Sequence, residues 1–161
     1  MLIRDAEPED WAAIWPFMRA IVAAGETFSW PRDIDERYAR EIWYPAPPGR
    51  TFVAVDDGTV VGTANSVANH MGPASHIASA SFMVDPAHHG RGAGRALGRH
   101  VLERARADGF RAMQFNAVVE TNERAVALWR SLGFKILATL PEGFHHPSKG
   151  YVGLHIMHRR L

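Results

Sequence analysis

The segment from Phe82 to Arg95 constrains this chain more than any other, because a glycine-rich turn joins a strand-like run to a helix there. The apolar run 78–84 ends at Asp85-Pro86, and glycines at alternate positions then lead into residues with helical spacing. Such a turn points several backbone N–H groups and the positive end of a helix dipole at one place, and glycine lets an anion approach the main chain. The segment therefore predicts a strand–turn–helix unit that can hold phosphate groups.

Two common phosphate-binding motifs are absent from this turn. A P-loop requires Gly-Lys-Ser or Gly-Lys-Thr after its first glycine, and the chain has neither. A dinucleotide fingerprint requires a glycine where Arg95 stands. Glycines in this pattern also form tight turns that bind nothing, so the turn alone leaves both interpretations open.

Hydrophobic periodicity along the chain predicts a mixed sheet covered by helices. Strands are expected at 1–5, 51–55, 59–63, 78–84, 112–119, 134–140 and 151–158. Helices are expected at 8–25, 33–44, 92–106 and 122–133, and a loop is expected at 141–150. The predicted fold class is α/β (α+β), with about seven strands and about four helices in one domain spanning residues 1–161.

Composition excludes several kinds of chemistry. The 161 residues include no Cys, which excludes disulfides, iron–sulfur clusters and a cysteine nucleophile. No run of about 18 apolar residues occurs, so we expect no membrane span and a cytoplasmic location. No metal site is expected either, because His155 and His158, three apart in a predicted strand, would point to opposite faces.

A second motif runs from Asn122 to Phe134 and reads Asn-Glu-Arg-Ala-Val-Ala-Leu-Trp-Arg-Ser-Leu-Gly-Phe. Together with the glycine-rich turn, it resembles the GCN5-related N-acetyltransferase (GNAT) family. The cofactor motif of that family reads Gln/Arg-x-x-Gly-x-Gly/Ala, and its second motif reads Asn-x-x-Ala-x-x-Leu-Tyr-x-x-x-Gly-Phe. The motifs span 82–134, roughly a third of the chain, and the order of predicted elements also fits. The resemblance implies the fold of an acyl-CoA N-acyltransferase.

The resemblance further implies that acetyl-coenzyme A is the cofactor and that it lies on the two motifs. Its pyrophosphate would lie on the N–H groups of 91–95, and main chain at Met83 and Val84 would pair with the pantetheine arm. Asn116 and Ala117 would line a gap between two splayed strands. The expected cofactor-binding residues are Met83, Val84, His89, Gly90, Arg91, Gly92, Ala93, Gly94, Arg95, Asn122, Ala125, Leu128 and Trp129.

Two residues depart from the family motifs. His89 stands where the family has Gln or Arg, at a position that works largely through its backbone. Trp129 replaces a Tyr that many members use to protonate the departing thiolate. An indole N–H donates hydrogen bonds but is no useful acid, so that proton must come from another group or from water.

The acceptor implied by the resemblance is a small amine, which we expect to be amino-acid-like and to attack acetyl-CoA directly in a ternary complex. An acyl-enzyme is not expected, because Cys is absent and no Ser lies in a Gly-x-Ser-x-Gly elbow. The expected substrate-binding residues are Phe28, Trp30, Ser79 and Asn116, and the candidate catalytic residues are Asn116 and Glu26. Other candidates for a general base are His76, Glu120 and the pair His145-His146, any of which could equally be an ordinary polar residue.

Two other functions remain open. Trp129 in place of an acid would suit an acyl-CoA-binding module without turnover, and the arginine-rich helix after Gly92 would suit a nucleic-acid-binding domain. Against the second, the formal net charge is only +1, and Glu103 and Asp108 interrupt the basic face. We therefore expect no nucleic-acid or membrane partner, whereas exposed strands would allow a homodimer.

Overall fold

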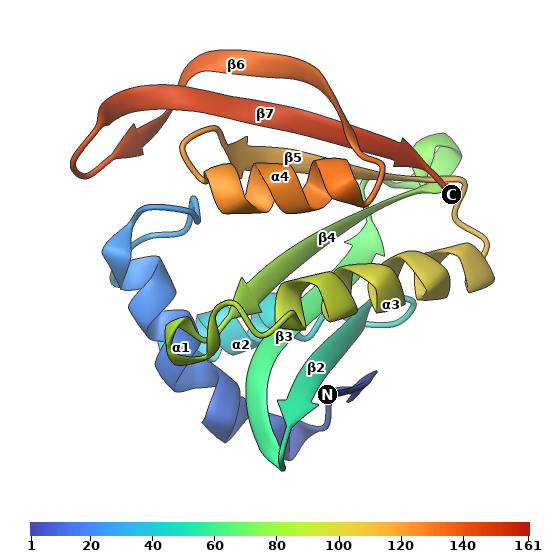
Figure 1. Cartoon of the computed structure of the whole chain (residues 1–161). Coiled ribbons are helices and arrows are strands. Elements are labelled where there is room, and N and C mark those ends of the chain that lie inside the picture. The colour runs from blue at the N-terminus through green and yellow to red at the C-terminus, as the bar shows by residue number, and fades with distance from the viewer.

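A seven-stranded mixed sheet organises the computed structural model, which describes residues 1–161 (Figure 1). The strand order is β1-β2-β3-β4-β5-β7-β6, and β4 and β5 are the one parallel pair. The strands are β1 (Leu2–Asp5), β2 (Arg50–Asp56), β3 (Thr59–Ala68), β4 (Ile77–Val84), β5 (Ala112–Val119), β6 (Lys135–His146) and β7 (Gly150–Arg160). The predicted fold class is confirmed, including the order of strands and helices.

Four α-helices cover the sheet: α1 (Trp11–Ala24), α2 (Glu36–Trp43), α3 (Ala93–Ala107) and α4 (Glu123–Ser131). Short 3-10 turns lie at Pro8–Asp10, Gly72–Ala74 and Pro86–His88. The ends of the helices follow local signals, since Gly25 ends α1 in a left-handed conformation and Asp35 caps α2 by accepting from the Tyr38 N–H. No helix has both the length and the apolar character needed to cross a membrane.

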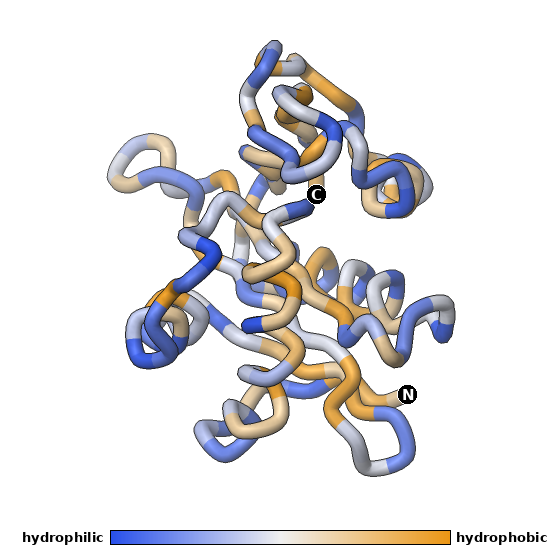
Figure 2. The backbone as a smooth tube through the Cα atoms, turned by 90° about the vertical axis from the view of Figure 1, so that its left-hand side faces the viewer, coloured by the Kyte–Doolittle hydropathy of each residue, from blue (hydrophilic) through white to orange (hydrophobic).

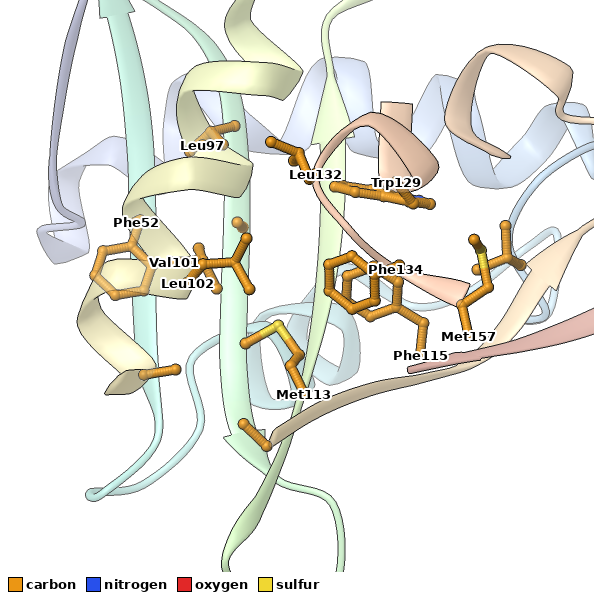
Figure 3. Packing of buried hydrophobic residues seen from close by; sticks show 14 of the residues in the cluster. Phe52, Leu97, Val101, Leu102, Met113, Phe115, Trp129, Leu132, Phe134 and Met157 are labelled. Atoms are coloured by element: carbon orange, nitrogen blue, oxygen red, sulfur yellow. The ribbon is translucent and has the colours of Figure 1, made fainter. Parts of the chain in front are cut away.

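The core divides into two clusters because side chains alternate along the strands. On β2, Phe52 and Ala54 pack under α3 and α4, whereas Val53 faces α1 and α2 together with Met83 of β4. Figure 3 shows the first cluster, and Figure 2 shows hydrophobic segments in the interior with hydrophilic ones at the turns. The sheet is therefore covered on both faces, with α1 and α2 on one and α3 and α4 on the other.

Helices α3 and α4 approach closely at Gly98. A Cβ at this position would lie 2.7 Å from Leu132 Cδ1 and 3.2 Å from the Trp129 ring, so only glycine fits without displacing them. Gly94, one turn earlier on α3, faces Leu128 of α4. The two helices therefore run side by side in the same direction, and their N-termini lie at the same end.

The C-terminal hairpin differs from the prediction of a loop at 141–150. Strand β6 continues to His146, and the turn before β7 is only a few residues long. A register shift between Leu140 and Phe144, with Glu142 at a φ of +52°, carries the chain past Pro141. Because β6 is an edge strand, it tolerates both the proline and the bulge, and sequence signals that normally end a strand do not end this one.

Candidate active site

The candidate site is a cleft between β4 and β5, which begin as neighbours and then separate. They pair only at Ile77–Ala112 and Ala78–Met113, and the strands diverge beyond these residues (Figure 1). The resulting cleft has a volume of about 650 Å³. It extends from the loop between α1 and α2 to the N-terminal turns of α3 and α4.

Strand β4 presents unpaired main chain to this cleft. Asn69 N–H donates to the Ile77 carbonyl, and Asp85 N–H donates to the Val61 carbonyl. These two bonds show which opposed residues of the antiparallel strands β3 and β4 are hydrogen-bonded to each other, since every second pair is. In that alternation the main-chain groups of Met83 face β3, and those of Val84 and Phe82 face the cleft. Of the two residues expected to pair with a bound chain, only Val84 therefore has its N–H and carbonyl available, and Phe82 is the second such residue.

Strand β5 forms the opposite wall, and its ladder is interrupted there. The register with β7 shifts between Phe115 and Val118, which leaves Asn116 and Ala117 outside the ladder and lining the cleft. Asn116 Nδ2 donates to Asn69 Oδ1 at 2.6 Å, and Asn116 Oδ1 accepts from Gln114 Nε2 at 3.0 Å. The Asn116 amide is thus held in place by two neighbouring amides at the rim.

The turn between β4 and α3 forms the far end of the cleft. Gly90 and Gly92 have φ values of +82° and +87°, which favour glycine, and Gly92 is the N-cap of α3. The first helical bond of α3 runs from Ala96 N–H to the Gly92 carbonyl, and no main-chain N–H of 90–95 donates to another part of the protein. These N–H groups lie free at the N-terminus of α3, where the sequence predicts an anion cradle, and Arg95 lines the cleft beside them.

An aromatic cluster closes the middle of the cleft. Trp129 is 7% exposed, and its ring centroid lies 4.6 Å from Phe82 and 4.8 Å from Phe115. The indole N–H has no protein partner, yet no buried side-chain nitrogen is left unsatisfied, so this N–H keeps some exposed surface, in a residue that lines the cleft. Nearby, Asn122 Oδ1 accepts from the Ala125 N–H at 3.3 Å, so the Asn122 side chain caps α4.

The other end of the cleft is lined by the loop between α1 and α2. Phe28 and Trp30 meet at 5.7 Å edge to face, and Trp30 rests against the buried Trp43 at 5.9 Å. Hydroxyl groups of Ser79 and Ser81 on β4 complete this end. No Asp or Glu lines any part of the cleft, and no group of three or more His, Asp or Glu side chains could hold a metal ion.

Most of the predicted site residues come together here, and the side chains of two lie elsewhere. Every predicted cofactor-binding residue except Arg91 lines the cleft, as do the four predicted substrate-binding residues. The Arg91 side chain instead lies 3.8 Å from Asp56, at the turn between β2 and β3. Glu26 is exposed and does not line the cleft, because the loop presents its neighbours inward. The alternative bases, His76, Glu120 and His145-His146, are also absent from its walls.

Several lining residues were not predicted, among them Thr27, Ser81, Phe82, Phe115 and Arg124. Ser81 had a signal, because residues two apart on a strand share a face and Ser79 was already a candidate. Arg124 lies at a variable position of the second motif, so no pattern pointed to it. Phe82 and Phe115 pack in the core cluster and also line the cleft. A hydrophobic strand pattern predicts burial, but it does not tell a core residue from one that lines a cleft.

Known proteins resemble this chain in both sequence and structure. The profile of the acetyltransferase (GNAT) family matches residues 15–134. A GCN5-related N-acetyltransferase from Kribbella flavida is 56% identical, with a TM-score of 0.97 over 99% of this chain and 97% of that one. The protein yncA from Salmonella typhimurium, solved with its cofactor acetyl-CoA, is 26% identical, with a TM-score of 0.83 over 100% of this chain and 94% of that one.

A curated relative matches over a shorter stretch. The N-acetyltransferase aca1 of Schizosaccharomyces pombe is 35% identical over 89 residues, which are 55% of this chain and 43% of that protein. The chain thus matches less than half of the length of that relative. The family profile, in contrast, covers both motifs and most of the sheet. The chain belongs to the acetyltransferase (GNAT) family.

Proposed function

We propose that this protein transfers the acetyl group of acetyl-CoA to the amine of a small, amino-acid-like acceptor, by direct attack within a ternary complex. The observation that carries the proposal is the cleft between β4 and β5, which has a cradle of free N–H groups at one end and an aromatic, hydroxyl-lined wall at the other. One end suits the diphosphate of a thioester carrier, and the other end suits an acceptor.

The cofactor fits the residues in a definite order. The N–H groups of 90–95 and the α3 dipole would bind the diphosphate, with Arg95 and Arg124 adding positive charge. The main chain of Val84 and Phe82 would hydrogen-bond the pantetheine arm as an added strand. The thioester end would then lie against Trp129. Bound there, acetyl-CoA supplies an activated acetyl group, and the chain contributes its placement beside the amine.

The acceptor end favours an uncharged or anionic molecule over a polycation. Since no carboxylate lines the cleft, nothing there would compensate the multiple charges of a polyamine or an aminoglycoside. The hydroxyls of Ser79 and Ser81 and the amide of Asn116 are suited to bind the carboxylate of an amino acid. No carboxylate lines the cleft and its two histidines, His88 and His89, lie at the turn before α3, so we propose that water, rather than Glu26, takes the amine proton at the acceptor end.

A thiol-release assay tests this function directly, and a protein without Cys adds no background. We expect release with amino acids or their analogues and little with polyamines and aminoglycosides. Turnover that is fastest with a polyamine would contradict the acceptor class but leave the acetyltransferase assignment intact. Tight acetyl-CoA binding without release on any amine would favour the acyl-CoA-binding module, which the lack of an acid at Trp129 makes the second candidate.

We also propose that the protein forms a homodimer through β6. This strand is the sheet edge, and its hairpin with β7 exposes Leu137, Leu140 and Tyr151 at 61%, 57% and 65%. Three large apolar side chains exposed on one hairpin favour burial against a second copy. Sedimentation should give twice the mass of the chain, and Leu137→Lys should lower it. A monomer at all concentrations would contradict the proposal.

A further inference from the structure

Three side-chain amides form a hydrogen-bonded row at the rim of the cleft. Gln114 Nε2 donates to Asn116 Oδ1 at 3.0 Å, and Asn116 Nδ2 donates to Asn69 Oδ1 at 2.6 Å. Gln114 and Asn116 lie on β5, whereas Asn69 directly follows β3 and is 47 residues from Asn116 in the sequence. The fold therefore brings this amide row together from two separate strands, and only its middle member, Asn116, lines the cleft.

The amide row lies on the same face of the sheet as the proposed acceptor site. On β5, Phe115 packs in the core cluster with α3 and α4, so its neighbours Gln114 and Asn116 point to the opposite face. On β4, Met83 packs in the cluster of α1 and α2, and Ser81 shares its face because it lies two residues earlier on the strand. The Asn116 amide and the Ser81 hydroxyl thus line the cleft from the same side of the sheet.

The two hydrogen bonds fix which way the Asn116 amide is turned. A free amide can rotate about its last bond and exchange the places of its oxygen and nitrogen. Here Gln114 offers a donor to the oxygen and Asn69 offers an acceptor to the nitrogen, so a reversed Asn116 would lose both bonds unless both neighbours turned as well. An amide has two N–H groups and two oxygen lone pairs, so one N–H and one lone pair of Asn116 stay free for a ligand.

The direction of this amide matters because the acceptor end has no cation. The arginines that line the cleft are Arg95 and Arg124, which stand in the first turns of α3 and α4 and are assigned above to the diphosphate. A carboxylate at the other end depends on neutral donors, and an amide helps only if it presents its N–H. A reversed amide would present an oxygen lone pair, which repels a carboxylate.

We infer that Asn69 and Gln114 are positioning residues, which hold the Asn116 amide so that its free N–H binds the carboxylate of the acceptor. The inference rests on the proposed amino-acid-like acceptor and names the residues that select it. Neither Asn69 nor Gln114 lines the cleft, so both act through Asn116.

Thiol-release kinetics with the L-amino acids tests the inference, and the amino acid that the wild type acetylates fastest is the probe. Asn69→Ala and Gln114→Ala should each raise the KM for this amino acid about fivefold, the equivalent of one hydrogen bond, with kcat and acetyl-CoA affinity close to those of the wild type. With the carboxamide of the same amino acid, the KM should change little, because a carboxamide can pair with the Asn116 amide in either direction.

Two charged variants test the direction of the amide. Asn69→Asp and Gln114→Glu add the same negative charge, but Asn69→Asp keeps the oxygen that accepts from Asn116, whereas Gln114→Glu removes the N–H that donates to it. Asn69→Asp should therefore rescue the KM that Asn69→Ala raises, and Gln114→Glu should raise KM at least as much as Gln114→Ala does.

The remaining outcomes separate this inference from the proposed function. A wild type that acetylates no amino acid would contradict the proposed acceptor, and the inference would fall with it. An amino acid that is turned over with the same KM by the wild type and both alanine variants would overturn the inference alone. Equal effects of the two charged variants, or rescue by Gln114→Glu instead of Asn69→Asp, would overturn it too. Acetyl-CoA affinity, measured in every variant, reports whether it is folded.

Discussion

Replacing Trp129 tests both the packing and the chemistry assigned to the cleft. The side chain is 7% exposed and contacts Phe82, Phe115 and the close crossing at Gly98. Trp129→Ala should therefore cost about 3–5 kcal/mol of unfolding free energy, as large-to-small changes in cores do. Trp129→Phe keeps one six-membered ring and loses roughly 50 Å² of buried surface, so it should cost about 1–2 kcal/mol.

The effect on catalysis separates a hydrogen-bond donor from an acid. Trp129→Phe removes one neutral hydrogen-bond donor, and this loss should lower kcat about threefold to tenfold. Loss of a true general acid would lower kcat by about 100-fold or more. Acetyl-CoA affinity should change little, because Phe82 and Phe115 still line the cleft.

Urea unfolding and steady-state kinetics measure the two effects, with Trp15→Phe as the control. Trp15 stacks on Trp11 at 5.7 Å on the other face of the sheet, so its replacement should lower stability without changing kcat. A Trp129→Ala variant that loses less than about 1 kcal/mol would refute the packing argument. A Trp129→Phe variant that loses about 100-fold or more in kcat, at about unchanged affinity, would contradict this weak role and show that the indole donates to charge that develops in the transition state.

Three further predictions follow from other parts of the structure. Gly92→Glu should abolish acetyl-CoA binding by calorimetry, since it puts a side chain and a negative charge at the cradle; wild-type affinity would contradict the placement. Asn116→Ala should raise the acceptor KM or lower kcat while acetyl-CoA affinity stays nearly constant, and a loss confined to the cofactor would reassign the residue. Asp10→Asn should cost about 1 kcal/mol at pH 7, because the hydrogen bonds from Arg4 hold the pKa of that carboxyl below its usual range. That cost should disappear in urea unfolding as pH falls through the lowered pKa, where the wild-type carboxyl is also protonated, and a cost that persists in acid would show that charge is not its cause.

The sequence predicted those parts of the protein that depend on local signals. The strand–turn–helix unit is one of them. The turn itself requires glycine at 90 and 92, and the first N–H groups of any helix have no partner within that helix. The order of elements was likewise readable from hydrophobic periodicity. Family membership rested on two motifs and is confirmed.

Features that depend on distant parts of the chain were not predictable. Arg91 was expected at the phosphates, but its side chain faces Asp56, which is brought there by the β2–β3 turn. Glu26 lies in the correct loop, yet which side chains of that loop face inward is set by packing against Trp43.

The crystal structure of the acetyl-CoA complex tests the central claim most directly. The account predicts that the diphosphate lies within hydrogen-bonding distance of main-chain N–H groups of residues 90–95, with the pantetheine arm beside Val84. A complex with the diphosphate away from this turn, or with the arm outside the gap between β4 and β5, would contradict it.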